Sequence, residues 1–201
     1  MQNQAVVKLK YCHKKCASQR IECCVITEDI SSEFCVDYIL SHFLPEIHAR
    51  IMVVAMTGCD PQAKSGASAV SALLEASRHA NKKPIKFIGV FDNDQEFEAT
   101  FTDRRIEMTR KMILSNKEPF DQILTNVARL NIDRIEEKLT GFSALFFEHE
   151  GLNYHDHLIK VAQLMAVDVR LIWRFCLDIW IASNREDCEK LAKQIENLTL
   201  V

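Results

Sequence analysis

Residues 50–81 read RIMVVAMTGCDPQAKSGASAVSALLEASRHAN, and this stretch decides the fold class. Arg50 to Met56 begins with a polar residue and continues as an apolar run bounded by Gly58 and Pro61, which is typical of a buried strand. From Ser65 to Asn81 the apolar residues recur at helical spacing, which predicts a helix. A strand followed at once by a helix favours a fold that combines both kinds of element.

Short strand patterns lie on both sides of this stretch. Val6 to Cys12 and Arg20 to Thr27 are rich in apolar and β-branched residues, and the polar segment between them predicts an N-terminal hairpin. Ile85 to Phe91 and Phe97 to Thr102 flank Asp92-Asn93-Asp94-Gln95 and predict a second hairpin. The sequence therefore predicts an α+β fold, with a mixed sheet built from an N-terminal hairpin, a central strand and a second hairpin, packed with several helices.

Helical patterns account for most of the remaining chain. Ser31 and Ser32 offer an N-cap for a helix that follows the first hairpin. Asp103 to Glu150 has a helical period with breaks in it, and Pro119 suits a first helical turn. Ser183-Asn184-Arg185-Glu186 matches a capping box, which predicts a final helix.

The segment from Val167 to Ala182 fits two kinds of element. Every odd position is apolar, which is the alternation of a strand. Arg170, Arg174 and Asp178 also recur at a spacing of four, as on one face of a helix. Enrichment in Trp, Phe, Val and Ile favours the strand.

Length and composition predict a single globular domain that covers residues 1–201. At 201 residues the chain is long enough to bury a large core, and it contains no repeat or linker that would divide it. A net charge of -3 lacks the basic surface expected of a nucleic-acid binder. Charged side chains interrupt the most apolar stretch, Leu158 to Ala182, which argues against a membrane span. We therefore expect a soluble protein that does not bind nucleic acid and has no membrane span.

Cysteine usage and the N-terminus predict a cytoplasmic location. The first ten residues lack the apolar core of a secretory signal. Without a secretory context, the 8 cysteines are expected to stay reduced, and several of them to be small core residues.

The sharpest candidate for a cofactor site is residues 58–65, GCDPQAKS, which have the spacing of a phosphate-binding loop between a strand and a helix. In such a loop Gly58 and the backbone would hold phosphate, Lys64 would supply charge, and Ser65 would help to hold Mg²⁺. Asp92, at the end of the next apolar run, would add a second carboxylate for the metal.

The same loop departs from the pattern at three positions. Ala63 replaces the second glycine, Pro61 removes one N–H donor, and Asp60 would repel phosphate. These departures favour an ordinary turn between strand and helix, with Ser65 as the N-cap.

Two clusters contain residue types that bind metals. Cys12, Cys16 and Cys23, with His13 and Cys24 beside them, would supply zinc ligands across a hairpin, but they lack paired C-x₂-C units. Buried or idle thiols therefore remain the favoured interpretation. The second cluster consists of polar residues around Gly151, namely Glu148, His149, Glu150, His155, Asp156 and His157. His155 and His157 would not share a helix face, which favours a polar helix junction over a metal site.

No catalytic motif is complete in this sequence, so the patterns favour a non-catalytic role. We expect a protein–protein interaction module, an adaptor or chaperone-like subunit of a larger assembly that binds another protein or a peptide segment and needs no cofactor. Trp173 and Trp180 are the candidate partner-binding side chains, because aromatic residues anchor many interfaces. The alternative is a nucleotide-binding enzyme that uses the degenerate phosphate loop at residues 58–65.

Overall fold

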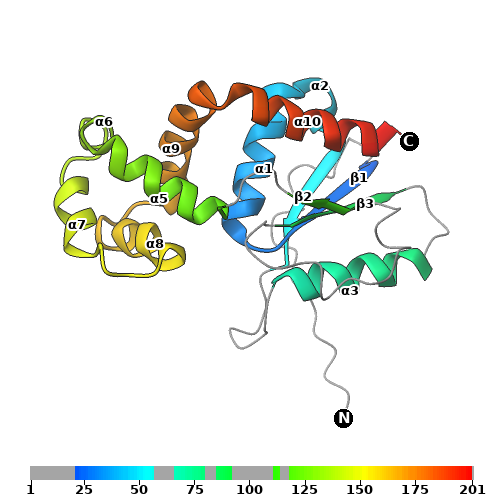
Figure 1. Cartoon of the computed structure of the whole chain (residues 1–201), viewed down its shortest axis with the longest axis horizontal. Helices are drawn as coiled ribbons and strands as arrows, with labels where there is room; N and C mark the ends of the chain where they lie inside the picture. The colour runs from blue at the N-terminus through cyan, green and yellow to red at the C-terminus, as the bar shows by residue number, and fades with distance from the viewer. Residues whose placement is uncertain (1–20, 57–65, 80–84, 92–110, 114–117, 201) are drawn as a thin grey trace, which may run out of the picture.

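A computed structural model describes residues 21–56, 66–79, 85–91, 111–113 and 118–200. Within these ranges the chain has the predicted α+β fold. Helices cover both faces of a parallel sheet, and a further group of helices lies beside it (Figure 1).

The sheet has four strands, which run parallel to one another. They are β1 (Cys23–Thr27), β2 (Ile51–Ala55), β3 (Lys86–Phe91) and β4 (Lys111–Ile113). Their order across the sheet is β2-β1-β3-β4. All three neighbouring pairs are parallel.

The parallel order shows that the hairpin arrangement predicted from the sequence is wrong. β1 pairs with β2 along its whole length, and on its other edge Cys23 to Ile26 pair with β3. Because parallel strands occupy both edges of β1, no antiparallel neighbour can pair with it. β1 is buried on both faces, and such a strand has an apolar pattern that does not reveal the direction of its partners. Val6 to Cys12 and Phe97 to Thr102 lie outside the described residues.

Nine helices are described in full or in part. They are α1 (Ile30–Phe43), α2 (Pro45–His48), α3 (Gly66–His79), α5 (Phe120–Leu130), α6 (Ile132–Glu136), α7 (Phe142–Glu148), α8 (Tyr154–Leu164), α9 (Val169–Ser183) and α10 (Arg185–Leu200). The helices predicted after Ser31, after Ser65 and after Asn184 are confirmed. The N-cap of α1 is Asp29 and neither of the predicted serines, because the helix begins at Ile30.

The strand predicted for Val167 to Ala182 is wrong, because this segment forms helix α9. Asp168 caps the helix by accepting a hydrogen bond from the backbone N–H of Arg170 at 2.9 Å. The buried side chains recur at helical intervals and include Ile172 and Cys176, two apolar residues at even positions. A helix buries these two residues on one face, whereas a strand would have placed them among the charged side chains.

Side chains alternate between the two faces of β1. Cys23 and Val25 belong to the larger core cluster, on the face that α1 covers. Cys24 and Ile26 face α3, where they pack with Val70. Figure 1 shows α3 on one side of the sheet and α1 and α10 on the other.

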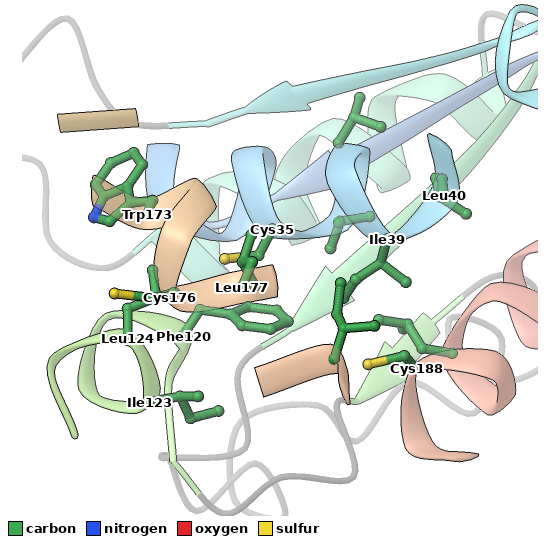
Figure 2. Packing of buried hydrophobic residues seen from close by; sticks show 14 of the residues in the cluster. Cys35, Ile39, Leu40, Phe120, Ile123, Leu124, Trp173, Cys176, Leu177 and Cys188 are labelled. Carbon is green, nitrogen blue, oxygen red and sulfur yellow. The ribbon is translucent and has the colours of Figure 1, made fainter. Parts of the chain in front are cut away.

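The larger core cluster continues from the sheet into the helices beyond it. Figure 2 shows Phe120 of α5 and Leu177 of α9 near Cys35 of α1. Because α1 contacts both the sheet and α5, it holds the beginning of α5 near the end of β1. The five described cysteines are buried, as expected for core thiols; they are Cys23, Cys24, Cys35, Cys176 and Cys188.

No helix in the described part of the chain has both the length and the apolar character needed to cross a bilayer.

Candidate functional site

The connections of the sheet mark its carboxyl edge, beside β1, as a place where a ligand can bind. From β1 the chain passes through α1 to β2 on one side, and then through α3 to β3 on the other side of β1. The direction of winding therefore reverses between β1 and β3. In open parallel sheets, ligands bind outside the carboxyl ends of the strands at such a reversal. Glu28 and Asp29 follow β1 at this edge.

Asp29 is held in a fixed orientation at the start of α1. Its Oδ1 atom accepts hydrogen bonds from the Ser31 hydroxyl and from the Ser32 backbone N–H, both at 2.7 Å. The Thr27 hydroxyl donates to the backbone carbonyl of Asp29 at 3.2 Å. These contacts place a carboxylate directly beyond the end of β1.

The first residue of α3 packs against the same edge. A Cβ atom added to Gly66 would lie 2.4 Å from the Glu28 carbonyl oxygen, so only glycine permits this approach. The amino ends of α1 and α3 therefore both lie near Glu28 and Asp29. Helix amino ends carry unpaired N–H groups and a partial positive charge, which favours anions beside them.

Two residues from the later helices join Asp29. Asp121 is the second residue of α5, and His155 is the second residue of α8. The Nδ1 atom of His155 lies 2.8 Å from Oδ2 of Asp121. One ligand atom from each of Asp29, Asp121 and His155 lies within 4.8 Å of the other two. We call these three residues the Asp–Asp–His group.

Burial makes the Asp121 carboxyl difficult to ionise. Asp121 is 8% exposed, and its pKa is raised from 3.8 to about 6. Burial is the main cause and the negative charge of Asp29 adds to it, whereas hydrogen bonds from His155 and Ser31 oppose the increase. The two carboxylates therefore repel each other in a setting that offers little solvent, and a proton or a cation between them relieves that repulsion.

The Asp–Asp–His group offers the donor set of a divalent cation site. Two carboxylate oxygens and an imidazole nitrogen suit Zn²⁺ or Mn²⁺, which bind such ligands at about 2.0–2.2 Å. Two ligand atoms of one such ion lie at most about 4.4 Å apart, so the three side chains, whose ligand atoms lie within 4.8 Å of one another, would close slightly around it. The side chain of His155 is 45% exposed, so a solute can reach the group from solvent.

A pocket of about 420 Å³ adjoins the group. Gln122, Thr125, Asn126 and Arg129 of α5 form one wall. Residues 150–154, between α7 and α8, form the opposite wall together with His157. Two residues of the pocket lie beside members of the group. Gln122 follows Asp121 in α5. The ring centroid of Tyr154 lies 4.1 Å from that of His155. The pocket and the Asp–Asp–His group are therefore neighbours.

The structure describes only some of the site residues predicted from the sequence. Those outside the described residues are Gly58, Lys64, Ser65, Asp92, Cys12 and Cys16. Cys23 lies in β1 and is 0% exposed. Trp173 is 2% exposed and packs on Phe34, whereas Trp180 is half-buried with its ring edge against Phe120.

The histidines around Gly151 make separate contacts. Nε2 of His157 lies 2.9 Å from the Phe146 carbonyl oxygen. Nδ1 of His149 lies 3.0 Å from the Leu145 carbonyl oxygen. Of the three, only His155 belongs to the Asp–Asp–His group.

Sequence reasoning missed Asp29 and Asp121. Asp29 carries a signal, because an acidic residue between a strand and a helix lies at the carboxyl edge of a parallel sheet. Asp121 carries none, because only the packing of α5 against α1 brings it to β1. No family model, curated protein or solved structure matches this chain at a significant level.

Proposed function

We propose that this protein binds a divalent cation through Asp29, Asp121 and His155 and uses it in a reaction on a phosphate-bearing small molecule. The observation that supports this proposal is the convergence of three ligand atoms within 4.8 Å at the carboxyl edge of β1. The reversal of winding beside β1 adds a reason to expect a ligand at this place.

Charge supports a cation at this position. Two carboxylates that lie close together in a buried setting favour a positive partner. The imidazole of His155 favours Mn²⁺ or Zn²⁺ over Ca²⁺ and Mg²⁺, which prefer oxygen ligands.

The same charges explain why phosphate would bind together with the cation. Asp29 and Asp121 repel a phosphate group, whereas a bound cation attracts its oxygens. The partial positive charge at the amino ends of α1 and α3 also favours a phosphate at this edge. A cation held here would polarise the phosphate and lower the pKa of a bound water molecule. This proposal retains the nucleotide-binding alternative from the sequence but assigns its cation to other residues.

Metal titration tests the proposal directly. Isothermal titration of the full chain with Mn²⁺ and Zn²⁺ should show one site, and Asp121→Asn should weaken its affinity at least about tenfold. Asp133→Asn is the matched control, because Asp133 is an exposed residue in the first turn of α6. Equal metal affinity in both variants, or no binding by the wild type, would contradict the cation site.

Activity is tested with a variant that leaves the helix cap intact. Asparagine caps helices about as well as aspartate, so Asp29→Asn removes a charge and keeps the start of α1. With Mn²⁺ present, we expect the wild type to release phosphate from ATP or p-nitrophenyl phosphate, and Asp29→Asn to lose this activity. Turnover that is unchanged in Asp29→Asn would separate the reaction from this site.

A second candidate function is the interaction module favoured by the sequence. Most of the large apolar side chains that are exposed among the described residues lie between α5 and α9. They are Leu130, Phe147, Leu152, Ile159, Leu164 and Leu171. Leu130 is the most exposed of them, at 82%.

The second candidate predicts a partner that depends on this surface. A pull-down from native lysate should recover a protein with the wild type and with Asp121→Asn, but not with Leu130→Glu combined with Phe147→Glu. Recovery of the same proteins by all three forms would argue against a role for these side chains.

A further inference from the structure

The pocket beside the Asp–Asp–His group has a wall made of one polar stripe of α5. The stripe begins at Gln122 and continues three, four and seven residues later with Thr125, Asn126 and Arg129. This spacing places the four side chains on one face of the helix. The opposite face of α5 is apolar and buried, as at Leu124 and Ala128. The polar stripe is therefore turned toward the pocket because the core takes the other side.

The acidic and basic side chains that line the pocket pair with each other. Arg129 pairs with Glu150 across the two walls, with 2.6 Å between Nη1 and Oε1. The other side chains of the stripe are carboxamides and a hydroxyl, which are uncharged. A pocket of this kind favours an uncharged polar group over an ion.

The lining retains hydrogen-bonding capacity. The Gln122 and Asn126 amides each donate one N–H to Glu118, at 3.4 and 3.3 Å, and each amide also has a carbonyl oxygen and a second N–H. His157 must donate through Nε2 to the Phe146 carbonyl, so Nδ1 of a neutral ring is an acceptor. The Thr125 hydroxyl is buried without a hydrogen-bond partner. The pocket thus presents donors and acceptors side by side.

We propose that this pocket binds the base of a nucleoside or nucleotide. A nucleobase is flat and uncharged and has alternating donors and acceptors along its edge, which carboxamides match in pairs. Tyr154 adds an aromatic ring to the lining, next to His155, and aromatic side chains stack on bases of every kind. The volume of about 420 Å³ lies within the range of small-molecule sites.

The position of the pocket deepens the proposed function. Because Gln122 and Tyr154 are chain neighbours of Asp121 and His155, a nucleotide with its base in the pocket would have its phosphate within reach of the proposed cation site. This last step rests on the proposed cation site, whereas binding of the base alone does not. Nucleosides, which lack phosphate, therefore test the pocket separately.

The experiment uses adenosine, guanosine, cytidine and uridine as probes, without metal. Titration of the full chain, followed by calorimetry, should give a dissociation constant in the millimolar range or below for at least one nucleoside. Asn126→Leu should weaken this binding at least tenfold, because leucine removes both the donor and the acceptor. Asn197→Leu, on the exposed face of α10, is the matched control and should bind like the wild type. If Asn126→Leu does not fold, Gln122→Leu replaces it.

Metal binding, measured on the same samples, separates the two proposals. Nucleoside binding without a metal site would support the pocket and overturn the proposed function. A metal site with no binding of any nucleoside at 10 millimolar, a level of about ten times the weakest affinity expected, would overturn the pocket. Binding of methyl glucoside in place of the nucleosides would also overturn it, since a sugar would then be the ligand.

Discussion

His155 and Asp121 are 34 positions apart in the sequence, and 2.8 Å separates Nδ1 of the first from Oδ2 of the second. Their contact joins the first turn of α8 to the first turn of α5, beside Asp29 at the end of β1. A histidine that holds a buried carboxyl next to a second carboxyl makes this edge of the sheet sensitive to pH and to cations.

Asp121 should make the protein less stable at neutral pH than at acidic pH. Its folded pKa of about 6 lies above the ordinary value of 3.8. The stability that this raised pKa confers is fully present below pH 3.8 and is lost as the pH rises through about 6. The difference corresponds to about 3 kcal/mol in the free energy of unfolding.

The measurement is urea unfolding of the wild type and Asp121→Asn at pH 4 and pH 8. Between these two values, the wild type should lose about 2–3 kcal/mol relative to the variant, whose side chain cannot ionise. Parallel pH profiles for the two proteins would show that Asp121 is solvated more than its burial indicates. Addition of Mn²⁺ at pH 8 should restore stability to the wild type alone, if the cation site exists.

Thr125→Val should leave the free protein as stable as the wild type or make it more stable. The Thr125 hydroxyl is buried and lacks a hydrogen-bond partner, so its burial costs free energy that no bond repays. Valine has nearly the same shape and no polar atom, and we expect a gain of about 0–1 kcal/mol in the free energy of unfolding. Thermal unfolding of both proteins measures this change. A clear loss of stability would mean that the hydroxyl has a partner, such as an ordered water molecule.

The sequence predicted the class of fold because local patterns were strong where the chain is regular. The apolar run before Gly58 and the helical spacing after Ser65 correspond to β2 and α3. Whether neighbouring strands run parallel or antiparallel was not predictable in the same way. Arg20 to Thr27 was correctly expected to contain a strand, yet its apolar pattern was equally compatible with parallel neighbours.

The candidate site was hidden for a different reason. Asp29, Asp121 and His155 come from three helices, and each of them taken alone resembles an ordinary residue at the start of a helix. Only the apolar packing between α1, α5 and α8 brings them together, and no single segment of sequence encodes that packing.

Asp168→Ala should destabilise α9, the segment that the sequence placed in a strand. The Asp168 carboxylate accepts a hydrogen bond from the Arg170 N–H at 2.9 Å, and the loss of such a cap costs about 1 kcal/mol. Asp168→Asn keeps a capping oxygen and should remain close to the wild type. Urea unfolding of the three proteins gives the comparison. Equal losses in both variants would point to the charge of Asp168, since only the alanine removes the capping oxygen.

Gly66→Ala should disturb the carboxyl edge of the sheet at its closest backbone contact. The added Cβ would lie 2.4 Å from the carbonyl oxygen of Glu28, so α3 or the end of β1 must shift. Alanine is the better helix former by about 1 kcal/mol, but a contact this short between the Cβ atom and a backbone carbonyl oxygen outweighs that gain. We expect a net loss of about 1–3 kcal/mol in the free energy of unfolding.

Gly151→Ala is the matched control for this substitution, because a Cβ at Gly151 meets nothing within 4 Å. Its stability should stay within about 0.5 kcal/mol of the wild type. Because Glu28 precedes Asp29, a shift at Gly66 should also weaken Mn²⁺ binding, whereas Gly151→Ala should leave it unchanged. If Gly66→Ala is destabilised but binds Mn²⁺ as the wild type does, then Asp29 is either insulated from the packing of α3 or is not a ligand. Titration of Asp29→Asn decides between these two explanations, because only the second predicts that the variant retains full affinity.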